Sequence, residues 1–303
     1  MTFGGWKRVV AMLAFCGTGS ASPLLYTFGG DFVTQFTGAP TSLNQMDPAS
    51  AASVTNILTP VGDGSIGFNG GLVGAGGLLY AIGNDSLGNA TLYSFGTNGQ
   101  GLTAVSSNFN SAGDAANFGF YNGLAASGGV FYAIGNDGIG GQEALFQIGN
   151  GTATELQLLN TFGGTYSGLA WDPALNGFYA IIAGASAGEL QGDLLVSFLL
   201  GGPVGVTAQF SLLDGADSGT HLGGLADVGG GVLYDIYTNP NTFTGELERL
   251  NVSGPVAANT LYDSGVPLAQ NAGVAFIPSE VPEPGSLGAA GLALILALRL
   301  RRR

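Results

Sequence analysis

An internal repeat of about fifty residues constrains the fold of this chain more than any other feature of the sequence. The segment Gly71–Asp85 reads GLVGAGGLLYAIGND, and Gly123–Asp137 reads GLAASGGVFYAIGND. Looser copies begin at Gly168 and Gly224, and a truncated copy begins at Gly273, so the starting glycines lie 52, 45, 56 and 49 residues apart. A repeat of this length indicates that one supersecondary unit is built several times along the chain.

Each repeat contains enough short apolar segments for four β-strands. The copies quoted above supply a first and a second strand, because a Gly-Gly pair separates two alternating segments. The predicted third strands are residues 92–95, 144–148, 194–198 and 247–250. The predicted fourth strands are residues 102–106, 154–159, 206–212 and 257–262. Four short strands per unit are typical of a propeller blade, so we predict an all-β chain that forms a β-propeller of about five four-stranded blades. A β-sandwich and a β-solenoid are the alternatives.

Residue size within the repeat agrees with a propeller. The first strand reads Gly-Leu-Ala or similar, as expected where strands crowd around an axis. The second strand carries a tyrosine at one repeated position: Tyr80, Tyr132, Tyr179 and Tyr234. We interpret these rings as packing between blades, and a ligand-binding stripe is the alternative.

The two ends of the repeat region predict a closed ring. Leu24–Gly29 reads LLYTFG and looks like a third strand without its first two, whereas Gly273–Ile277 looks like a first strand with nothing after it. Pairing these two segments would close the circle and leave no exposed sheet edge. The count of first strands then gives five blades, although no second strand is identified for the closing blade.

The charge distribution excludes one class of partner. Between residues 22 and 285 the only basic residue is Arg249, against all 20 acidic residues of the chain. Such a surface repels phosphate backbones and anionic headgroups, so we expect no binding to nucleic acid. Divalent cations and neutral glycans remain open as ligands.

The N-terminal segment has the organisation of a secretory signal peptide. Lys7 and Arg8 precede an apolar run, which small residues follow up to Ala21, the expected cleavage region. We therefore assign residues 1–21 to a signal peptide. The alternatives are a buried first strand or helix, and a lipoprotein signal at Cys16. Since Cys16 is the only cysteine, the mature chain would have neither a disulfide nor a cysteine nucleophile.

The C-terminal segment combines a proline motif, an apolar run and a basic cluster. The motif consists of Val281, Pro282, Glu283, Pro284 and Gly285. Residues 286–298 are apolar and small, and the chain closes with Arg299, Arg301, Arg302 and Arg303 around Leu300. A 13-residue helix spans roughly 20 Å against a hydrocarbon core of about 30 Å, so we predict a short transmembrane helix that anchors the chain transiently. The arginines should flank this helix on the cytoplasmic side.

This order of motif, apolar helix and arginine cluster resembles the PEP-CTERM sorting signal, with a residue-by-residue match at Pro282, Glu283 and Pro284. The resemblance implies recognition by an exosortase-type membrane enzyme and transport to the envelope or outer surface of a Gram-negative, often exopolysaccharide-producing bacterium. We expect three parts in the chain: the signal peptide, a propeller-like passenger over residues 22–279, and the sorting tail over residues 280–303.

Candidate catalytic and metal-binding residues are few. His221 is the only histidine, and Asp214, Asp217 and Ser218 lie near it in sequence without the pattern of a triad, so we interpret it as an ordinary loop residue. One histidine and no thiol disfavour zinc. We expect no cofactor, although carboxylate-bearing turns leave calcium open. These turns are Asn84-Asp85-Ser86, Asn136-Asp137-Gly138 with Glu143, and Asp214 with Asp217.

The sequence as a whole predicts an exported, non-enzymatic surface or matrix protein that associates with exopolysaccharide or biofilm. One alternative is a secreted propeller enzyme that acts on glycans or lactones through carboxylates and calcium. Several acidic side chains converging on the propeller axis would favour that alternative. A third possibility is a passive spacer.

Overall fold

Twenty β-strands form in the part of the chain that the computed structural model describes. The described residues are 24–29, 41–46, 54–61, 67–84, 89–109, 120, 122–136, 142–187, 190–210, 221, 224–238, 245–255, 257–262 and 273–278. All twenty strands belong to one compact unit, Leu24–Ile277.

The strands group into five antiparallel sheets of four, which we number as blades 1 to 5. Blade 1 contains β20 (Val274–Ile277), β1 (Leu24–Gly29), β2 (Thr41–Met46) and β3 (Val54–Val61). Blade 2 contains β4 (Gly67–Ala75), β5 (Leu78–Asn84), β6 (Ala90–Phe95) and β7 (Thr103–Ser106). Blade 3 contains β8 (Asn122–Ser127), β9 (Val130–Asn136), β10 (Glu143–Ile148) and β11 (Ala153–Leu158). Blade 4 contains β12 (Thr165–Asp172), β13 (Gly177–Ala187), β14 (Leu190–Phe198) and β15 (Gly205–Gln209). Blade 5 contains β16 (Leu225–Gly229), β17 (Val232–Thr238), β18 (Gly245–Asn251) and β19 (Ala257–Tyr262).

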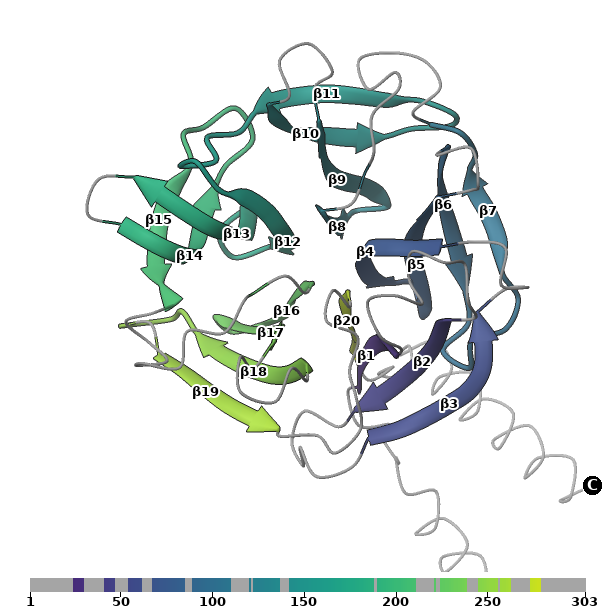
Figure 1. Cartoon of the computed structure of the whole chain (residues 1–303). Helices are drawn as coiled ribbons and strands as arrows, with labels where there is room; N and C mark the ends of the chain where they lie inside the picture. Colours follow the sequence, from purple (N-terminus) through teal and green to yellow (C-terminus); the bar gives the residue numbers. More distant parts are fainter. Residues whose placement is uncertain are drawn as a thin grey trace, which may run out of the picture. The chain divides into compact units, whose positions relative to one another are not determined.

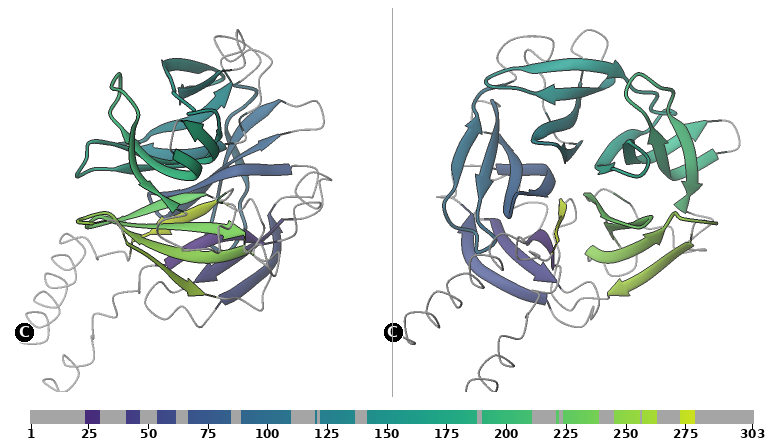
Figure 2. Two further views of the ribbon diagram at one scale, coloured as in Figure 1. Left: turned by 60° about the vertical axis from the view of Figure 1, so that its left-hand side comes forward. Right: turned by 180° about the vertical axis from the view of Figure 1, so that it is seen from behind.

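The blades stand around a central axis, with the first strand of each blade innermost and the fourth outermost (Figure 1). The view from behind shows the same ring (Figure 2). Each innermost strand contacts the innermost strands of the neighbouring blades. The prediction of a five-bladed all-β propeller is therefore confirmed, and the β-sandwich and β-solenoid alternatives are wrong.

Glycine pairs form the turn between the first and second strands of blades 2 and 3. Gly76 and Gly77 both have positive φ angles, 57° and 77°, and Gly128 and Gly129 repeat this geometry with 58° and 82°. Positive φ at both central residues is the requirement of the two-residue hairpin turn that matches strand twist. The repeated Gly-Gly pair in the sequence is thus a backbone requirement of the inner hairpin.

The glycine that starts each repeat allows the blades to approach one another at the axis. A Cβ atom placed on Gly123 would lie 2.7 Å from the backbone nitrogen of Leu169 in the next blade. The same holds at Gly71, whose added Cβ would lie 2.6 Å from the nitrogen of Leu124, and at Gly273, where the distance to the nitrogen of Leu72 is 2.4 Å. Backbone cannot rotate away as a side chain can, so these positions exclude any larger residue.

The repeated tyrosines pack between blades, which confirms their interpretation as core. The ring centroid of Tyr80 lies 4.6 Å from that of Phe131 in blade 3. Tyr132 stacks on Trp171 of blade 4, at 6.3 Å between centroids. Tyr234, which is 4% exposed, belongs to the apolar cluster that joins blade 5 to blade 1. Each ring thus covers part of the next blade rather than a ligand site.

The closing blade corrects one strand assignment. β20 pairs directly with β1, as predicted, but β1 is the second strand of the blade and not the third. Tyr26 of β1 lies opposite Ala275, in the same register as Tyr80 opposite Val73. Leu25-Tyr26-Thr27-Phe28-Gly29 therefore corresponds to Leu79-Tyr80-Ala81-Ile82-Gly83, and Tyr26 is a fifth repeated tyrosine. The two kinds of strand are easily confused because second and third strands have the same alternation of apolar and polar residues.

The predicted signal peptide (residues 1–21) and sorting tail (residues 280–303) lie outside the described residues. Within the described part of the chain, no helix has the length and apolar character needed to cross a membrane.

Candidate functional site

The propeller axis contains a cavity of about 90 Å³. Its walls come from the five innermost strands and consist of Val, Ala, Leu and Gly residues together with Trp171, Asp227 and Phe276. Burial raises the pKa of Asp227, and nearby Asp172 raises it further, while the amide of Gly229 opposes this by donating to Asp227 Oδ1 at 2.9 Å. Several carboxylates converging on the axis would favour the enzymatic alternative, but among the described residues that line this cavity Asp227 is the only one.

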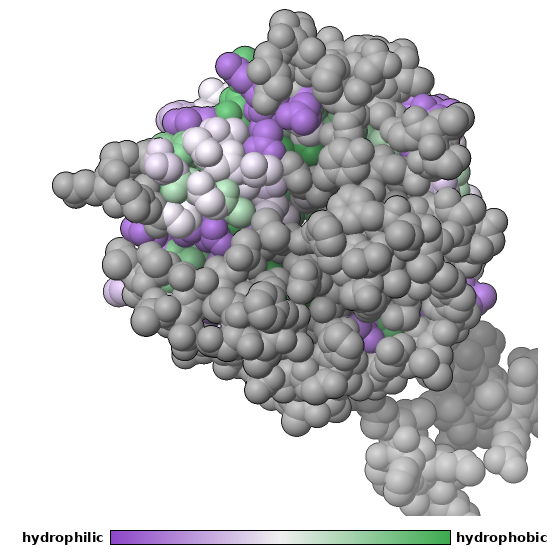
Figure 3. Space-filling model, in the orientation of Figure 1, coloured by the Kyte–Doolittle hydropathy of each residue, from purple (hydrophilic) through white to green (hydrophobic). Residues whose placement is uncertain are grey.

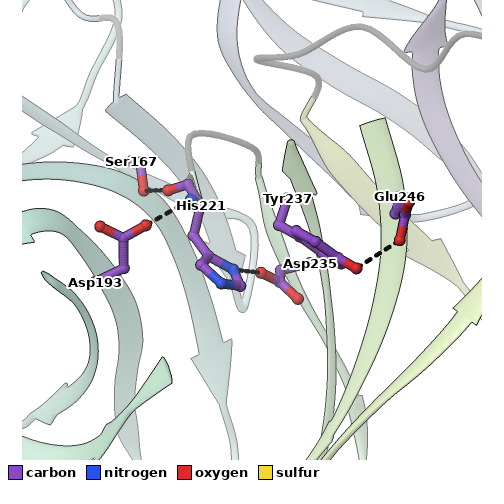
Figure 4. A network of polar contacts seen from close by, with 6 residues as sticks. All are labelled: Ser167, Asp193, His221, Asp235, Tyr237 and Glu246. Atoms are coloured by element: carbon purple, nitrogen blue, oxygen red, sulfur yellow. Dashed lines mark hydrogen bonds and ion pairs between the residues drawn. The ribbon is translucent and has the colours of Figure 1, made fainter. Parts of the chain in front are cut away.

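Polar groups gather instead between blades 4 and 5, around His221 (Figure 4). The imidazole is fully buried, and its Nδ1 lies 2.7 Å from Asp235 Oδ2. Its ring stacks on Phe210, at 3.7 Å between centroids, and on Tyr237, at 5.4 Å. His221 lies outside the strands, in agreement with a loop residue, but its buried ring is a fixed part of the blade contact, which the sequence did not predict.

The main chain of His221 is held from blade 4. Its N–H donates to Asp193 Oδ2 at 2.6 Å, and its carbonyl oxygen accepts from Ser167 Oγ at 2.5 Å. On blade 5, the Tyr237 hydroxyl donates to Glu246 Oε2 at 2.5 Å. These contacts fix the position of the imidazole from both blades.

Two further carboxylates share this face of blade 5. Residues directly opposite one another on adjacent strands point to the same side of a sheet. Asp235 lies opposite both Leu225 and Glu248, and Tyr237 lies opposite Glu246. Asp235, Glu246 and Glu248 are 0%, 4% and 2% exposed. We call His221, Asp235, Tyr237, Glu246 and Glu248 the His221 cluster.

The other blades have uncharged residues at the positions of Asp235 and Glu248. Strand register gives the equivalent pairs: Ala81 with Tyr93, Ala133 with Phe146, Ala180 with Val196, and Thr27 with Asn44. Blade 5 alone among the described blades carries two carboxylates there. Since the Asp235 position is buried in every blade, this exchange is a specific departure from the repeat rather than surface variation.

His221 itself occupies a position that is phenylalanine in the repeats of blades 2 and 3. Phe68 and Phe120 each lie four residues before the leucine of the first strand, as His221 does before Leu225. In blade 3 the equivalent contact is wholly apolar, because Phe120 packs edge-on against Phe109 and Phe146 at 4.9 and 5.1 Å. The His221 cluster thus replaces a phenylalanine cluster of the same architecture.

The charge of the His221 cluster is unbalanced. It buries three carboxyl groups and one imidazole. Arg249 is the only Lys or Arg among the described residues, and it lies opposite Tyr234 in the strand register, on the other face of β18. Burying carboxylates away from water costs several kcal/mol per ion unless a cation or a proton compensates. One ligand atom each from His221, Asp235 and Glu248 lie within 4.8 Å of one another, which is a spacing that a metal ion can bridge after small side-chain adjustments.

The His221 cluster does not have the arrangement of a hydrolytic triad. A triad needs a nucleophile next to the imidazole, whereas Ser167, the hydroxyl nearest to this residue in the hydrogen-bond network, donates to the main-chain carbonyl. A fully buried and stacked ring is also closed to a substrate. Asp214, Asp217 and Ser218, the neighbours considered from the sequence, lie outside the described residues.

The remaining predicted sites are placed as follows. Glu143 is 6% exposed and accepts the N–H of Tyr166 at 2.8 Å, which links blade 3 to blade 4 and is a structural role. Its partners in the proposed calcium turn, Asp137 and Gly138, lie outside the described residues, as do Asp85 and Ser86. The sorting motif from Val281 to Gly285 and the flanking arginines from Arg299 to Arg303 lie outside them too.

Comparisons with known proteins show the fold and nothing more specific. No protein-family model matches the sequence, and no curated protein matches it. Among solved structures, an α-L-arabinofuranosidase from Clostridium thermocellum is 11% identical with a TM-score of 0.50, over 78% of this chain and 85% of that one. TolB from Acinetobacter baumannii is 12% identical with a TM-score of 0.48, over 89% and 70% of the two chains. A putative TolB from Agrobacterium tumefaciens is 12% identical with a TM-score of 0.43, over 84% and 98%. At these identities the likeness concerns chain architecture, so neither an activity nor a location follows from it.

Proposed function

We propose that this chain is an exported envelope protein of a Gram-negative bacterium, in which a five-bladed propeller is delivered by an N-terminal signal peptide and a C-terminal PEP-CTERM sorting tail. The observation that carries the proposal is the order of the tail: Pro282-Glu283-Pro284, thirteen apolar or small residues, and a terminal arginine cluster. An exosortase-type membrane enzyme is the partner that this tail implies.

The architecture of the passenger supports a binding or structural role at the surface. A closed ring leaves its sheets without long exposed edges, which limits edge-to-edge aggregation outside the cell. On the face shown in Figure 3, the coloured atoms alternate between hydrophilic and hydrophobic over short distances. The strongly acidic passenger also favours neutral or cation-bridged ligands over polyanions.

Replacing Pro282, Glu283 and Pro284 together by alanine is expected to stop sorting in the producing cells. Proline disfavours a helix, whereas alanine has the highest helix propensity, so the variant is expected to extend the predicted apolar helix through the motif and to make it less accessible. Cell fractionation of wild-type and variant strains measures the effect. Replacing Pro255 or Pro267, which lie before the tail, is the matched control and should leave sorting intact. Unchanged arrival of the triple variant at the surface would contradict the proposed role of the tail.

We further propose that the passenger associates with the exopolysaccharide of its own host, without chemical turnover. The test is co-sedimentation of residues 22–279 with that polysaccharide, followed by analysis of its chain length. Binding with unchanged polysaccharide length supports the proposal. A shortened polysaccharide would instead favour the enzymatic alternative, and no association would leave a passive spacer.

A secreted glycan-processing or lactone-processing enzyme is the second candidate, and the described residues favour it less. Such an enzyme needs carboxylates that a substrate can reach. The axial cavity offers Asp227, whereas the carboxylates of the His221 cluster are sealed between blades 4 and 5.

A further inference from the structure

We propose that the His221 cluster binds a divalent transition-metal ion, of the zinc or manganese class, that joins blade 4 to blade 5. The ligands are the imidazole of His221 and the carboxylates of Asp235 and Glu248. This inference is independent of the sorting tail and of the proposed surface role.

The donor set decides the class of metal. Three ligand atoms from these residues lie within 4.8 Å of one another, and all three residues are buried. Zinc binds imidazole nitrogen and carboxylate oxygen at about 2.0–2.2 Å, and mixed nitrogen and oxygen donors also suit manganese. Calcium prefers oxygen donors alone and six to eight of them, so an imidazole in the site selects against it. The proposed site departs from the expectation, drawn from the histidine count, that zinc is disfavoured, because carboxylates supply the remaining ligands.

The charge of the contact supplies the second argument. Three carboxyl groups and one imidazole are enclosed together, and a divalent ion would compensate the excess negative charge that this arrangement creates at neutral pH. At the contact between blades 2 and 3, the same positions are Phe120, Ala133 and Phe146, which need no ion. Three buried carboxyl groups lie together at the contact of blades 4 and 5, whereas Glu143 lies at the contact of blades 3 and 4 and accepts a main-chain N–H.

The surroundings hold the ligands in place. The main chain of His221 is fixed by Asp193 and Ser167 of blade 4 (Figure 4). Its ring stacks on Phe210 and on Tyr237. Glu246 is engaged by the Tyr237 hydroxyl. Contacts of this kind hold metal-ligating side chains in position and are common around metal sites. Because blade 4 holds the main chain of His221 while Asp235 and Glu248 lie on blade 5, the ion would act on the stability of the ring.

The test is a metal titration of the full chain after treatment with a chelator, followed by thermal unfolding. Zn²⁺ or Mn²⁺ at a hundredfold excess over its dissociation constant should raise Tm by roughly 5–10 °C for a domain of this size, and elemental analysis should find one ion per chain. Ca²⁺ at the same concentration should give no comparable shift. Equal Tm values with and without Zn²⁺ and Mn²⁺, or a shift with Ca²⁺ alone, would overturn the proposal.

Variants that carry the residues of blade 3 distinguish metal binding at this site from metal binding at the protein surface. His221→Phe and Asp235→Ala copy blade 3 and should abolish the Tm shift and the bound ion. Glu143→Gln removes a buried carboxylate outside the His221 cluster, retains an acceptor for Tyr166, and should keep the full response. If the single variants fail to fold, the triple variant His221→Phe, Asp235→Ala, Glu248→Phe restores the apolar pattern of blade 3. A metal response that survives in the triple variant would place the ion elsewhere and overturn the assignment.

Discussion

Replacing Gly123 by alanine is expected to lower the free energy of unfolding by about 3–5 kcal/mol, because two separate penalties act at this position. The residue has a φ of +75°, which an L-residue adopts at a cost. Its new Cβ atom would also lie 2.7 Å from the nitrogen of Leu169 and 2.9 Å from the carbonyl carbon of Gly168. Both atoms are backbone of the innermost strand of blade 4, so the clash can be relieved only by moving a blade. Urea denaturation measures the effect.

Alanine variants of two other glycines measure the backbone penalty and the steric penalty separately. Gly128 has a φ of +58° but open space around its Cβ position, so Gly128→Ala should cost only about 1 kcal/mol. Gly224 has no left-handed backbone, but its added Cβ would lie 2.4 Å from the nitrogen of Val274, so Gly224→Ala reports the steric penalty alone. If Gly123→Ala and Gly128→Ala had equal effects, close approach at the axis would not be what the repeated glycine provides.

The second large effect is expected from breaking the His221 cluster one residue at a time. In the metal-free protein, His221→Phe leaves three buried carboxyl groups beside an apolar ring, and we expect a loss of about 3–5 kcal/mol. The triple variant that copies Phe120, Ala133 and Phe146 should lie within about 1–2 kcal/mol of the metal-free wild type, since it removes three polar groups together and leaves Glu246 bonded to the Tyr237 hydroxyl. Urea denaturation in the presence of a chelator gives the free energies for both variants and for the wild type.

The series tests whether the losses in unfolding free energy of the single variants add up to the loss in the triple variant. Residues in one buried network couple strongly, whereas independent residues contribute additively. If the triple variant lost the sum of the three single effects, the polar groups would not form one network. The triple variant introduces residues that already pack together at the same positions of blade 3. It is therefore a better comparison than truncation to alanine, which would leave cavities.

The blade architecture can be predicted from the sequence because it follows from local rules repeated five times. Alternating apolar residues and a constant tyrosine position predict the hairpin of first and second strands in four repeats, three of which also have a Gly-Gly turn. The closing blade is the exception, because the alternation in Leu24–Gly29 also suits a third strand. Aligned on Tyr26, the segment matches the second strands, so the signal is present in the sequence.

The His221 cluster cannot be found by searching for motifs, because its members are set by strand register and not by spacing. His221 and Asp235 are fourteen residues apart, and Glu248 lies on the next strand, opposite Asp235. The only signal in the sequence is a departure from the repeat. Asp235 stands where three other repeats have alanine, and His221 stands where two others have phenylalanine. Comparison of the repeats with one another singles out these positions.

The central claim is that this chain is exported and that its two termini are handled as signals, with a metal-braced propeller as the delivered part. The most direct measurement is the intact mass of the wild-type protein recovered from the envelope of producing cells. We predict a chain that lacks residues 1–21 and ends near Pro282–Pro284. A chain of all 303 residues recovered from the cytoplasmic fraction would contradict the account.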